Sequence, residues 1–143
     1  MSVFFDKSTK TFYLEGKNTT YAFFIDNRGY LEHLYFGKKI ARDFILYTRA
    51  FGGHSCEAHI AGPETDPLTC YNAIGSELTT HGLGDFREPT LHVEHTEGDR
   101  LTELLFSSYE IVKEKPMPKG LPAMREGGET LIVRLTDEAK CFS

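Results

Sequence analysis

Three runs of aromatic and β-branched residues, separated by turn residues, constrain the fold of this chain most strongly. The runs are "KTFYLEG" from Lys10, "TTYAFFID" from Thr19 and "YLEHLYFG" from Tyr30. Such residues fit the half-buried surface of a β-sheet, so each run predicts a strand. The residues between the second and third runs, 27–29 (Asn-Arg-Gly), are typical of a hairpin turn.

The alternation of side chains within these runs predicts which residues share a face. In the second run, Tyr21, Phe23 and Ile25 fall on one face of the strand. In the third run we expect one face to carry Leu31, His33 and Tyr35, alternating with Glu32 and Leu34 on the other.

Strand character returns in the second half of the chain. We expect a strand in "TLHVEHT" (90–96), a turn in "EGD" and a final strand in "ETLIVRLTDE" (129–138). The segment "RLTELLFSSYEIVKEK" (100–115) suits a helix or a strand, and its flanking turn and its Tyr-Glu-Ile-Val run favour a strand. The prolines of "KPMPKGLPAM" exclude regular structure there and favour a rigid crossing between strands.

About seven strands joined by turns predict an all-β fold, an antiparallel β-sandwich. Residues 1–143 are expected to form one N-terminal sandwich domain or a fragment of it. Because the chain stops soon after its last strand, we expect the sandwich to be truncated at its C-terminal end.

Composition and charge exclude several classes of protein. The 21 acidic residues outnumber the 16 basic ones, and the net charge is −5, which argues against nucleic acid and anionic membranes as partners. The start "MSVFFDKSTK" lacks the apolar run of a signal peptide, and no stretch is long and apolar enough to span a bilayer. The three cysteines favour reduced thiols, so we expect a cytoplasmic protein.

A long irregular loop is expected over residues 52–84, which are rich in Gly, Pro, Thr, His and Asp. It contains four residues of metal-ligating type: His54, Cys56, His59 and Cys70. Their spacing differs from the paired Cys and His motifs of structural zinc sites. We therefore interpret the segment as a polar loop, with no metal or other cofactor, and keep a zinc site as the weaker alternative.

Five stretches, in this order, resemble the N-terminal domain of bacterial α-galactosidases of glycoside hydrolase family 36. They are "GKNTTY", "RGYLEHLYFGKKI", "GLGDFREP", "RLTELLFSSYEIVKEKPMPKGLPAM" and "ETLIVRLTDE". The resemblance covers most of the chain outside the middle loop. It implies a large β-sandwich, here part of a β-supersandwich, that precedes a (β/α)₈ catalytic barrel.

The resemblance also implies an activity that this segment does not carry by itself. The family removes terminal α-galactose from sugars such as melibiose and raffinose with retention, which requires two carboxylates about 5 Å apart. Both lie on the barrel in the family, so we expect no catalytic residue here and no activity of this chain alone. Many members are tetramers, and we expect a homo-oligomer.

The resemblance further suggests substrate contacts from the loop towards a neighbouring subunit. The stretch "TRAF" keeps Arg49, but Thr48 stands where the family has an Asp. Asp66 is retained, but Pro67 stands where an Arg is expected. In "GDFREP", Asp85 and Arg87 match the family at each position. The candidate substrate-binding residues are therefore Asp66, Arg49, Asp85 and Arg87.

For Asp85 and Arg87 a structural role competes with substrate binding. An Asp and an Arg two residues apart can brace a loop, and we prefer this interpretation for the pair. Glu77 and Asp85 could suggest a pair of catalytic carboxylates, but nothing in the sequence places them face to face.

Aromatic residues on a sandwich can also stack on sugars, so a free-standing carbohydrate-binding module is the alternative function. We prefer core packing for the large side chains of the third run, which are Tyr30, Leu31, Leu34, Tyr35 and Phe36.

Overall fold

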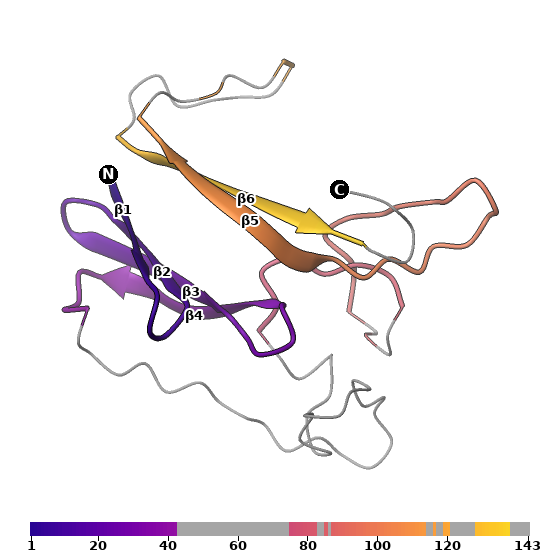
Figure 1. The fold of residues 1–143 in the computed structure, drawn as a ribbon, viewed down its shortest axis with the longest axis horizontal. Helices are drawn as coiled ribbons and strands as arrows, with labels where there is room; N and C mark the ends of the chain where they lie inside the picture. Colours follow the sequence, from indigo (N-terminus) through magenta and orange to yellow (C-terminus); the bar gives the residue numbers. More distant parts are fainter. Residues whose placement is uncertain are drawn as a thin grey trace, which may run out of the picture.

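The protein is represented by a computed structural model, in which residues 1–42, 75–82, 85, 87–113, 116, 119–120 and 128–137 are described. These residues include six strands: β1 Ser2–Asp6, β2 Thr11–Glu15, β3 Thr19–Ile25, β4 Leu31–Lys38, β5 Leu105–Val112 and β6 Thr130–Thr136. Figure 1 shows two antiparallel sheets, one with β1 to β4 in chain order and one with β5 and β6. The predicted all-β, antiparallel fold class is confirmed. No helix in the described part is long and apolar enough to cross a membrane.

The core lies between the two sheets and is built from stacked aromatic rings. Phe12 of β2 is fully buried and faces Phe5 of β1 and Phe23 of β3 in the strand register. The ring centroids are 4.4 Å apart for Phe5 and Phe12 and 5.0 Å apart for Phe12 and Phe23. Such cross-strand aromatic pairs stabilise a sheet beyond the area that they bury.

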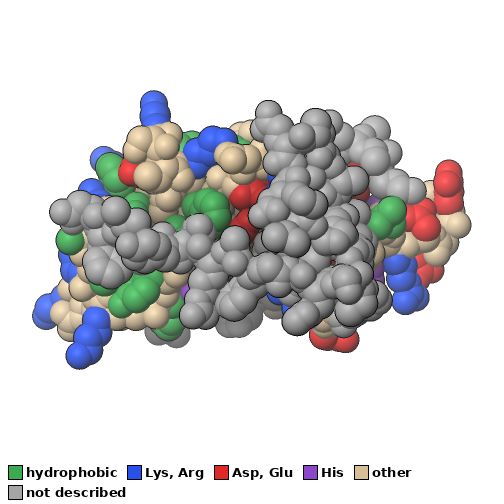
Figure 2. All heavy atoms as spheres, turned by 90° about the horizontal axis from the view of Figure 1, so that it is seen from below, with side chains coloured by type: hydrophobic (Ala, Val, Ile, Leu, Met, Phe, Trp, Pro, Cys, Tyr) green, Lys and Arg blue, Asp and Glu red, His purple; other side chains and the backbone are tan. Residues whose placement is uncertain are grey.

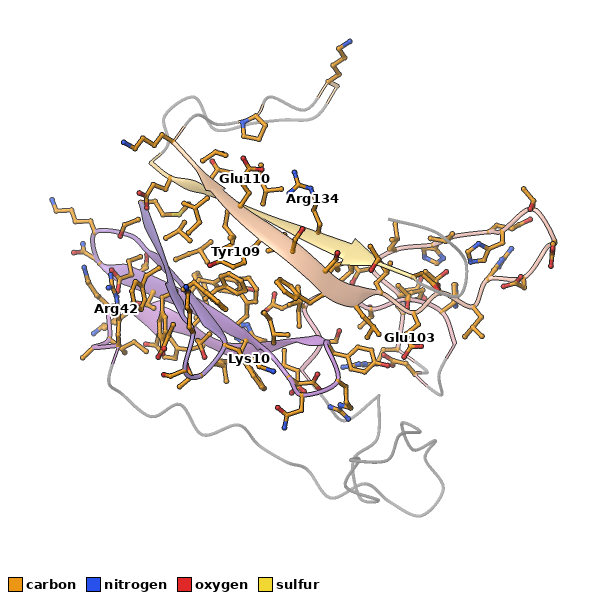
Figure 3. The ribbon with its side chains drawn as sticks, viewed as in Figure 1. Lys10, Arg42, Glu103, Tyr109, Glu110 and Arg134 are labelled. Carbon is orange, nitrogen blue, oxygen red and sulfur yellow. The ribbon has the colours of Figure 1, made fainter. Side chains whose placement is uncertain are left out.

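The hairpin of β5 and β6 covers this aromatic row. Tyr109 of β5 points into the space between the sheets (Figure 3), where its ring meets Phe12 edge-on at 5.1 Å. Phe106, Leu131 and Val133 pack against the same cluster. The strand assignment for β5 and the final strand β6 are therefore confirmed, although β5 begins only at Leu105.

The turn between β3 and β4 forms as the sequence predicts. The Asp26 carboxylate accepts hydrogen bonds from the backbone N–H groups of Arg28 (2.8 Å) and Tyr30 (2.9 Å). Gly29 has φ of 101°, a conformation that glycine adopts without the steric cost of a Cβ atom. Its amide donates to the Asp26 carbonyl, which closes the turn at 3.2 Å.

The prediction of which β4 side chains share a face is wrong beyond His33. The register pairs Phe23 with His33 and Tyr21 with Phe36, and it shifts at a bulge between Ala22 and Phe23. One extra residue in β4 moves the side chains after it to the opposite face. Phe36, not Tyr35, therefore shares a face with Tyr21, at 6.0 Å between ring centroids.

The core prediction for this strand is correct only in part. Tyr30 is 3% exposed, whereas Leu31, Leu34 and Tyr35 are half-buried. Phe36 is 72% exposed, so its assignment to the core is wrong in the described structure. The β5–β6 hairpin contributes Phe106, Tyr109, Leu131 and Val133 to the core cluster, and Phe36 is not a member of that cluster.

Two further strand expectations need correction. The segment 90–96 is not a strand, because the amides of Thr90 and Leu91 both donate to the carbonyl of Thr79 instead of joining a ladder. The turn that follows it does form, with the Gly98 amide donating to the His95 carbonyl at 2.8 Å. Strand β1 was not expected, and it pairs with β2 along its full length.

The surface carries its charges unevenly. On the face shown in Figure 2, most of the described Lys and Arg side chains lie at one end, and several Asp and Glu side chains lie at the other, next to a smaller basic patch. The large hydrophobic side chains that are exposed among the described residues are Met1, Phe4, Phe36, Leu101 and Ile111.

Candidate functional site

Two of the four candidate substrate-binding residues, Asp85 and Arg87, lie within the described structure. Arg49 and Asp66 lie outside the described residues. The same is true of the weak metal candidates, His54, Cys56, His59 and Cys70. For these six residues the sequence-based interpretation stays a prediction.

Asp85 and Arg87 form a two-pronged ion pair. The Arg87 Nε donates to Asp85 Oδ1 at 2.8 Å, and its Nη2 donates to Oδ2 at 2.7 Å. The Arg87 amide adds a third bond to Oδ1 at 3.0 Å. Parallel charge-assisted bonds of this kind fix both direction and distance. The expected bracing contact between these two residues is therefore present.

The environment of this pair keeps the carboxylate charged. The Asp85 side chain is 1% exposed, while that of Arg87 is 38% exposed. Burial raises the pKa of Asp85, but the Arg87 hydrogen bonds outweigh burial and hold the pKa below its usual value. The guanidinium thus faces water on one side and a buried anion on the other, which suits a residue that holds a loop in place.

Glu77 belongs to a second polar cluster that the sequence does not reveal. The Tyr21 hydroxyl donates to Glu77 Oε2, and His33 Nδ1 lies 3.0 Å from Oε1. Burial and then the Glu77 carboxylate raise the pKa of Tyr21, which keeps the hydroxyl protonated as a donor. Glu77 and Asp85 each face partners of their own.

The segment that carries Glu77 extends the sheet at the free edge of β4. The His33 amide donates to the Gly75 carbonyl at 2.6 Å, and the Glu77 amide donates to the Leu31 carbonyl at 3.0 Å. Ser76 forms a bridge with Glu32 between them. Backbone hydrogen bonds therefore hold residues 75–77 to β4, and the Tyr21 and His33 side chains add further contacts to Glu77.

Arg42, on the N-terminal side of the undescribed stretch 43–74, is held in a comparable way. Its guanidinium lies 4.2 Å from the centre of the Phe4 ring and donates to both carboxylate oxygens of Glu15. The Tyr13 hydroxyl also contacts the Arg42 carbonyl at 3.4 Å. Residues on both sides of 43–74, where Arg49 and Asp66 lie, are thus tied to the same sheet.

A third cluster groups two carboxylates with one guanidinium at the β3–β4 turn. Arg28 donates from Nε to Asp26 Oδ2 at 2.5 Å and from Nη2 to Glu32 Oε1 at 3.3 Å. Burial, followed by the charge of Asp26, raises the pKa of Glu32 to about 7. A carboxyl group that titrates near neutrality is a feature of functional sites, although ion-pair networks also produce it.

Among the described residues, no group of three or more His, Cys, Asp or Glu side chains could hold a metal ion. Together these clusters supply hydrogen bonds and charge, and each carboxylate in them is already bonded to protein groups. The described clusters can position a loop or contact a sugar.

Comparisons with known proteins identify the kind of chain to which these features belong. A family model described as "Glycosyl hydrolase family 36 N-terminal domain" matches residues 29–143. The bifunctional α-galactosidase/sucrose kinase AgaSK of Mediterraneibacter gnavus is 35% identical over 96% of this chain and 15% of its own length. The α-galactosidase AgaA of Geobacillus stearothermophilus is 32% identical over 96% of this chain and 19% of its own length.

Solved structures agree with the sequence comparison. The family 36 α-galactosidase AgaB from Geobacillus stearothermophilus superposes with a TM-score of 0.79 at 30% identity, covering 97% of this chain and 19% of that one. A variant of AgaA in complex with raffinose superposes with a TM-score of 0.71 at 30% identity, covering 91% of this chain and 18% of that one. This chain therefore spans about a fifth or less of the length of these relatives.

Proposed function

The chain belongs to the glycosyl hydrolase family 36 N-terminal domain family, and from this premise we propose that it is the non-catalytic N-terminal part of an α-galactosidase. The parent enzyme would hydrolyse terminal α-galactosyl residues of galacto-oligosaccharides such as melibiose and raffinose. The observation that carries the proposal is coverage: almost all of this chain matches the first fifth or less of each α-galactosidase described above. Solved relatives hold raffinose and stachyose, which supports this class of substrate.

In this role the chain supports the catalytic barrel, the oligomer and a loop at the substrate site. The Asp85–Arg87 brace and the anchored residues on either side of 43–74 support the loop role, because they would hold a sugar-contacting segment against a rigid sheet. Asp66 and Arg49 are the residues that we propose to reach the sugar, and the protein is proposed to work in the cytoplasm as a homo-oligomer.

A replacement experiment in a relative tests the proposal. AgaA with its matching N-terminal segment exchanged for this chain should hydrolyse a chromogenic α-galactoside, whereas AgaA lacking that segment should not. Changing Asp66 to Ala in the exchanged segment should raise KM more than it lowers kcat, because the residue would contact substrate without taking part in chemistry. An exchanged enzyme that folds but stays inactive would contradict the supporting role.

The isolated chain gives the complementary test. Retaining hydrolysis needs a nucleophile and an acid/base held at a fixed separation, and we propose that the catalytic barrel of the parent enzyme supplies both. The purified chain should show no turnover above buffer. Turnover that disappears on replacing Asp66, Glu77 or Asp85 with Ala, one at a time, would place an active site within this chain.

A second candidate function is a free-standing carbohydrate-binding module, and the exposed Phe36 is the observation that favours it. Phe36 is 72% exposed, and its ring lies 6.0 Å from that of Tyr21, so an aromatic surface is available to a sugar ring. Direct binding of raffinose to the isolated chain, lost on Phe36→Ala, would favour this candidate over the supporting domain.

A further inference from the structure

Two histidines that lie outside the clusters described above meet at their ring nitrogens. His81 Nε2 is 3.1 Å from His92 Nδ1, and the ring planes are inclined by 68°. At this distance one neutral imidazole donates a hydrogen bond to the other, so at least one ring is uncharged. A neutral imidazole is also the form that binds metal ions.

The backbone on which the two rings stand is held by buried threonines. The amides of Thr90 and Leu91 donate to the Thr79 carbonyl at 3.0 and 3.2 Å, and the Thr90 amide also donates to Thr79 Oγ1 at 2.9 Å. The Thr80 hydroxyl donates to the Thr102 carbonyl at 2.5 Å, and both residues are 3% exposed or less. The two segments are therefore fixed to each other next to the imidazoles. A ligand that binds both rings then needs to order little further backbone.

The separation of the two nitrogens fits two neighbouring ligands of one metal ion. Metal–nitrogen bonds of about 2.0–2.1 Å place two ligands about 2.9 Å apart at a right angle and about 3.3 Å apart at the tetrahedral angle. The observed 3.1 Å lies between these limits. Each ring then needs a modest rotation for its lone pair to face a shared ion, and the 59% exposure of His92 leaves room for that rotation and for water ligands.

A carboxylate is placed to support one of the rings. Glu88 Oε1 lies 3.4 Å from His92 Nε2, which is the ring nitrogen that faces away from His81. Histidines that bind metal commonly donate their other N–H to a carboxylate, which orients the ring and raises its basicity.

From this geometry we propose that His81 and His92 form a two-histidine binding site for a late first-row divalent transition-metal ion, the class of Ni²⁺, Cu²⁺ and Zn²⁺. Imidazole pairs select these ions over Mg²⁺ and Ca²⁺, which prefer oxygen ligands. Water completes the coordination, in keeping with the lack of any group of three metal-ligating side chains in the described part of the chain. The site is separate from the α-galactosidase role and would hold if that role were wrong.

Titration of the whole chain with NiCl₂, followed by calorimetry, tests the site. One ion per chain should bind at pH 7.5, and MgCl₂ should give no heat of binding. His81→Gln and His92→Gln should each weaken binding about tenfold or more, because a single exposed imidazole holds such an ion poorly. In the unmodified chain, substoichiometric Cu²⁺ should broaden the amide resonances around residues 81 and 92 before any others, a measurement that does not depend on a variant folding.

Matched variants separate this site from the other histidines. His95→Gln should leave binding unchanged, because His95 Nε2 lies 3.0 Å from the Leu101 carbonyl and 3.1 Å from Thr102 Oγ1 and so is occupied elsewhere. The double variant His54→Gln/His59→Gln should also keep the Ni²⁺ affinity. Loss of binding in that double variant, or retention of the full affinity in both His81→Gln and His92→Gln, would overturn the proposal.

Discussion

Arg42 donates two hydrogen bonds of 2.8 Å to Glu15, one to each oxygen of its carboxylate. The Glu15 side chain is 9% exposed and that of Arg42 is 43% exposed, so the pair lies at the boundary of the fold. Figure 3 places Arg42 at the end of the four-stranded sheet, far from the Glu110–Arg134 pair on the outer side of the β5–β6 hairpin. The Arg134 and Glu110 side chains are both more than half exposed, so the two ion pairs differ in burial. Stability measurements should distinguish them.

Arg42→Ala should lower the free energy of unfolding by about 1–2 kcal/mol, because a mostly buried carboxylate loses two charge-assisted bonds. Arg134→Ala is the matched control: its pair with Glu110 is 3.3 Å long and more than half exposed on both sides. Such a surface pair contributes about 0–1 kcal/mol, so this variant should unfold close to the unmodified chain. Urea unfolding of both variants gives the comparison, and equal losses would show that burial of Glu15 is unimportant.

Glu32 should make stability depend on pH. Its folded pKa is about 7, raised first by burial and then by Asp26, and so lies above the value of an unfolded chain. A raised pKa gives stability that is fully present below about pH 4.3 and is lost as the pH rises to about 7. Glu32→Gln removes this loss, so the variant should match the unmodified chain at pH 4 and exceed it at pH 8. After allowing for partial solvent screening, the gain should be about 1 kcal/mol.

Urea unfolding at the two pH values measures this effect, and Glu94→Gln serves as its control. Glu94 is 64% exposed and pairs with Arg100 at the surface, so its substitution should change stability little at either pH. A Glu32→Gln variant that is less stable than the unmodified chain at pH 8 would mean that its contact with Arg28 outweighs burial.

Tyr21→Phe should loosen the segment at residues 75–77. The substitution removes the hydroxyl that donates to Glu77 and leaves a half-buried carboxylate with one fewer donor, a cost of about 1 kcal/mol. Hydrogen exchange at the Glu77 amide, which donates to the Leu31 carbonyl, should become faster than in the unmodified chain. Tyr35→Phe is the control, since its hydroxyl donates to the exposed Lys38 carbonyl and should leave that exchange rate unchanged.

The contacts that the sequence predicts are those made by residues close together along the chain. The β3–β4 turn and the Asp85–Arg87 pair each depend on neighbours two to four residues apart. The Tyr21–Glu77 and His33–Glu77 contacts join residues 56 and 44 positions apart. Nothing in the composition of either segment indicates such a meeting, because it depends on how the chain returns to the edge of β4.

The errors in strand β4 arise from register. The alternation of side chains predicts faces only while pairing stays regular, and one bulge exchanges the two faces. Tyr35 and Phe36 are both large and aromatic, so their identities do not indicate which of them turns inward. The pairing of Phe36 with Tyr21 becomes evident only once the bulge is known.

Phe12 and Phe36 give the sharpest test of which aromatic residues hold the fold together. Phe12 is fully buried and contacts rings from both sheets, so Phe12→Ala should cost about 3–5 kcal/mol, enough to unfold a marginally stable chain. Phe12→Leu fills more of the space and should keep the fold at a smaller cost. Phe36→Ala should change stability by less than about 0.5 kcal/mol, because most of its ring already faces water. Urea unfolding monitored by near-ultraviolet circular dichroism measures all three variants, and a Phe36→Ala loss as large as that of Phe12→Leu would mean that Phe36 packs into the core after all.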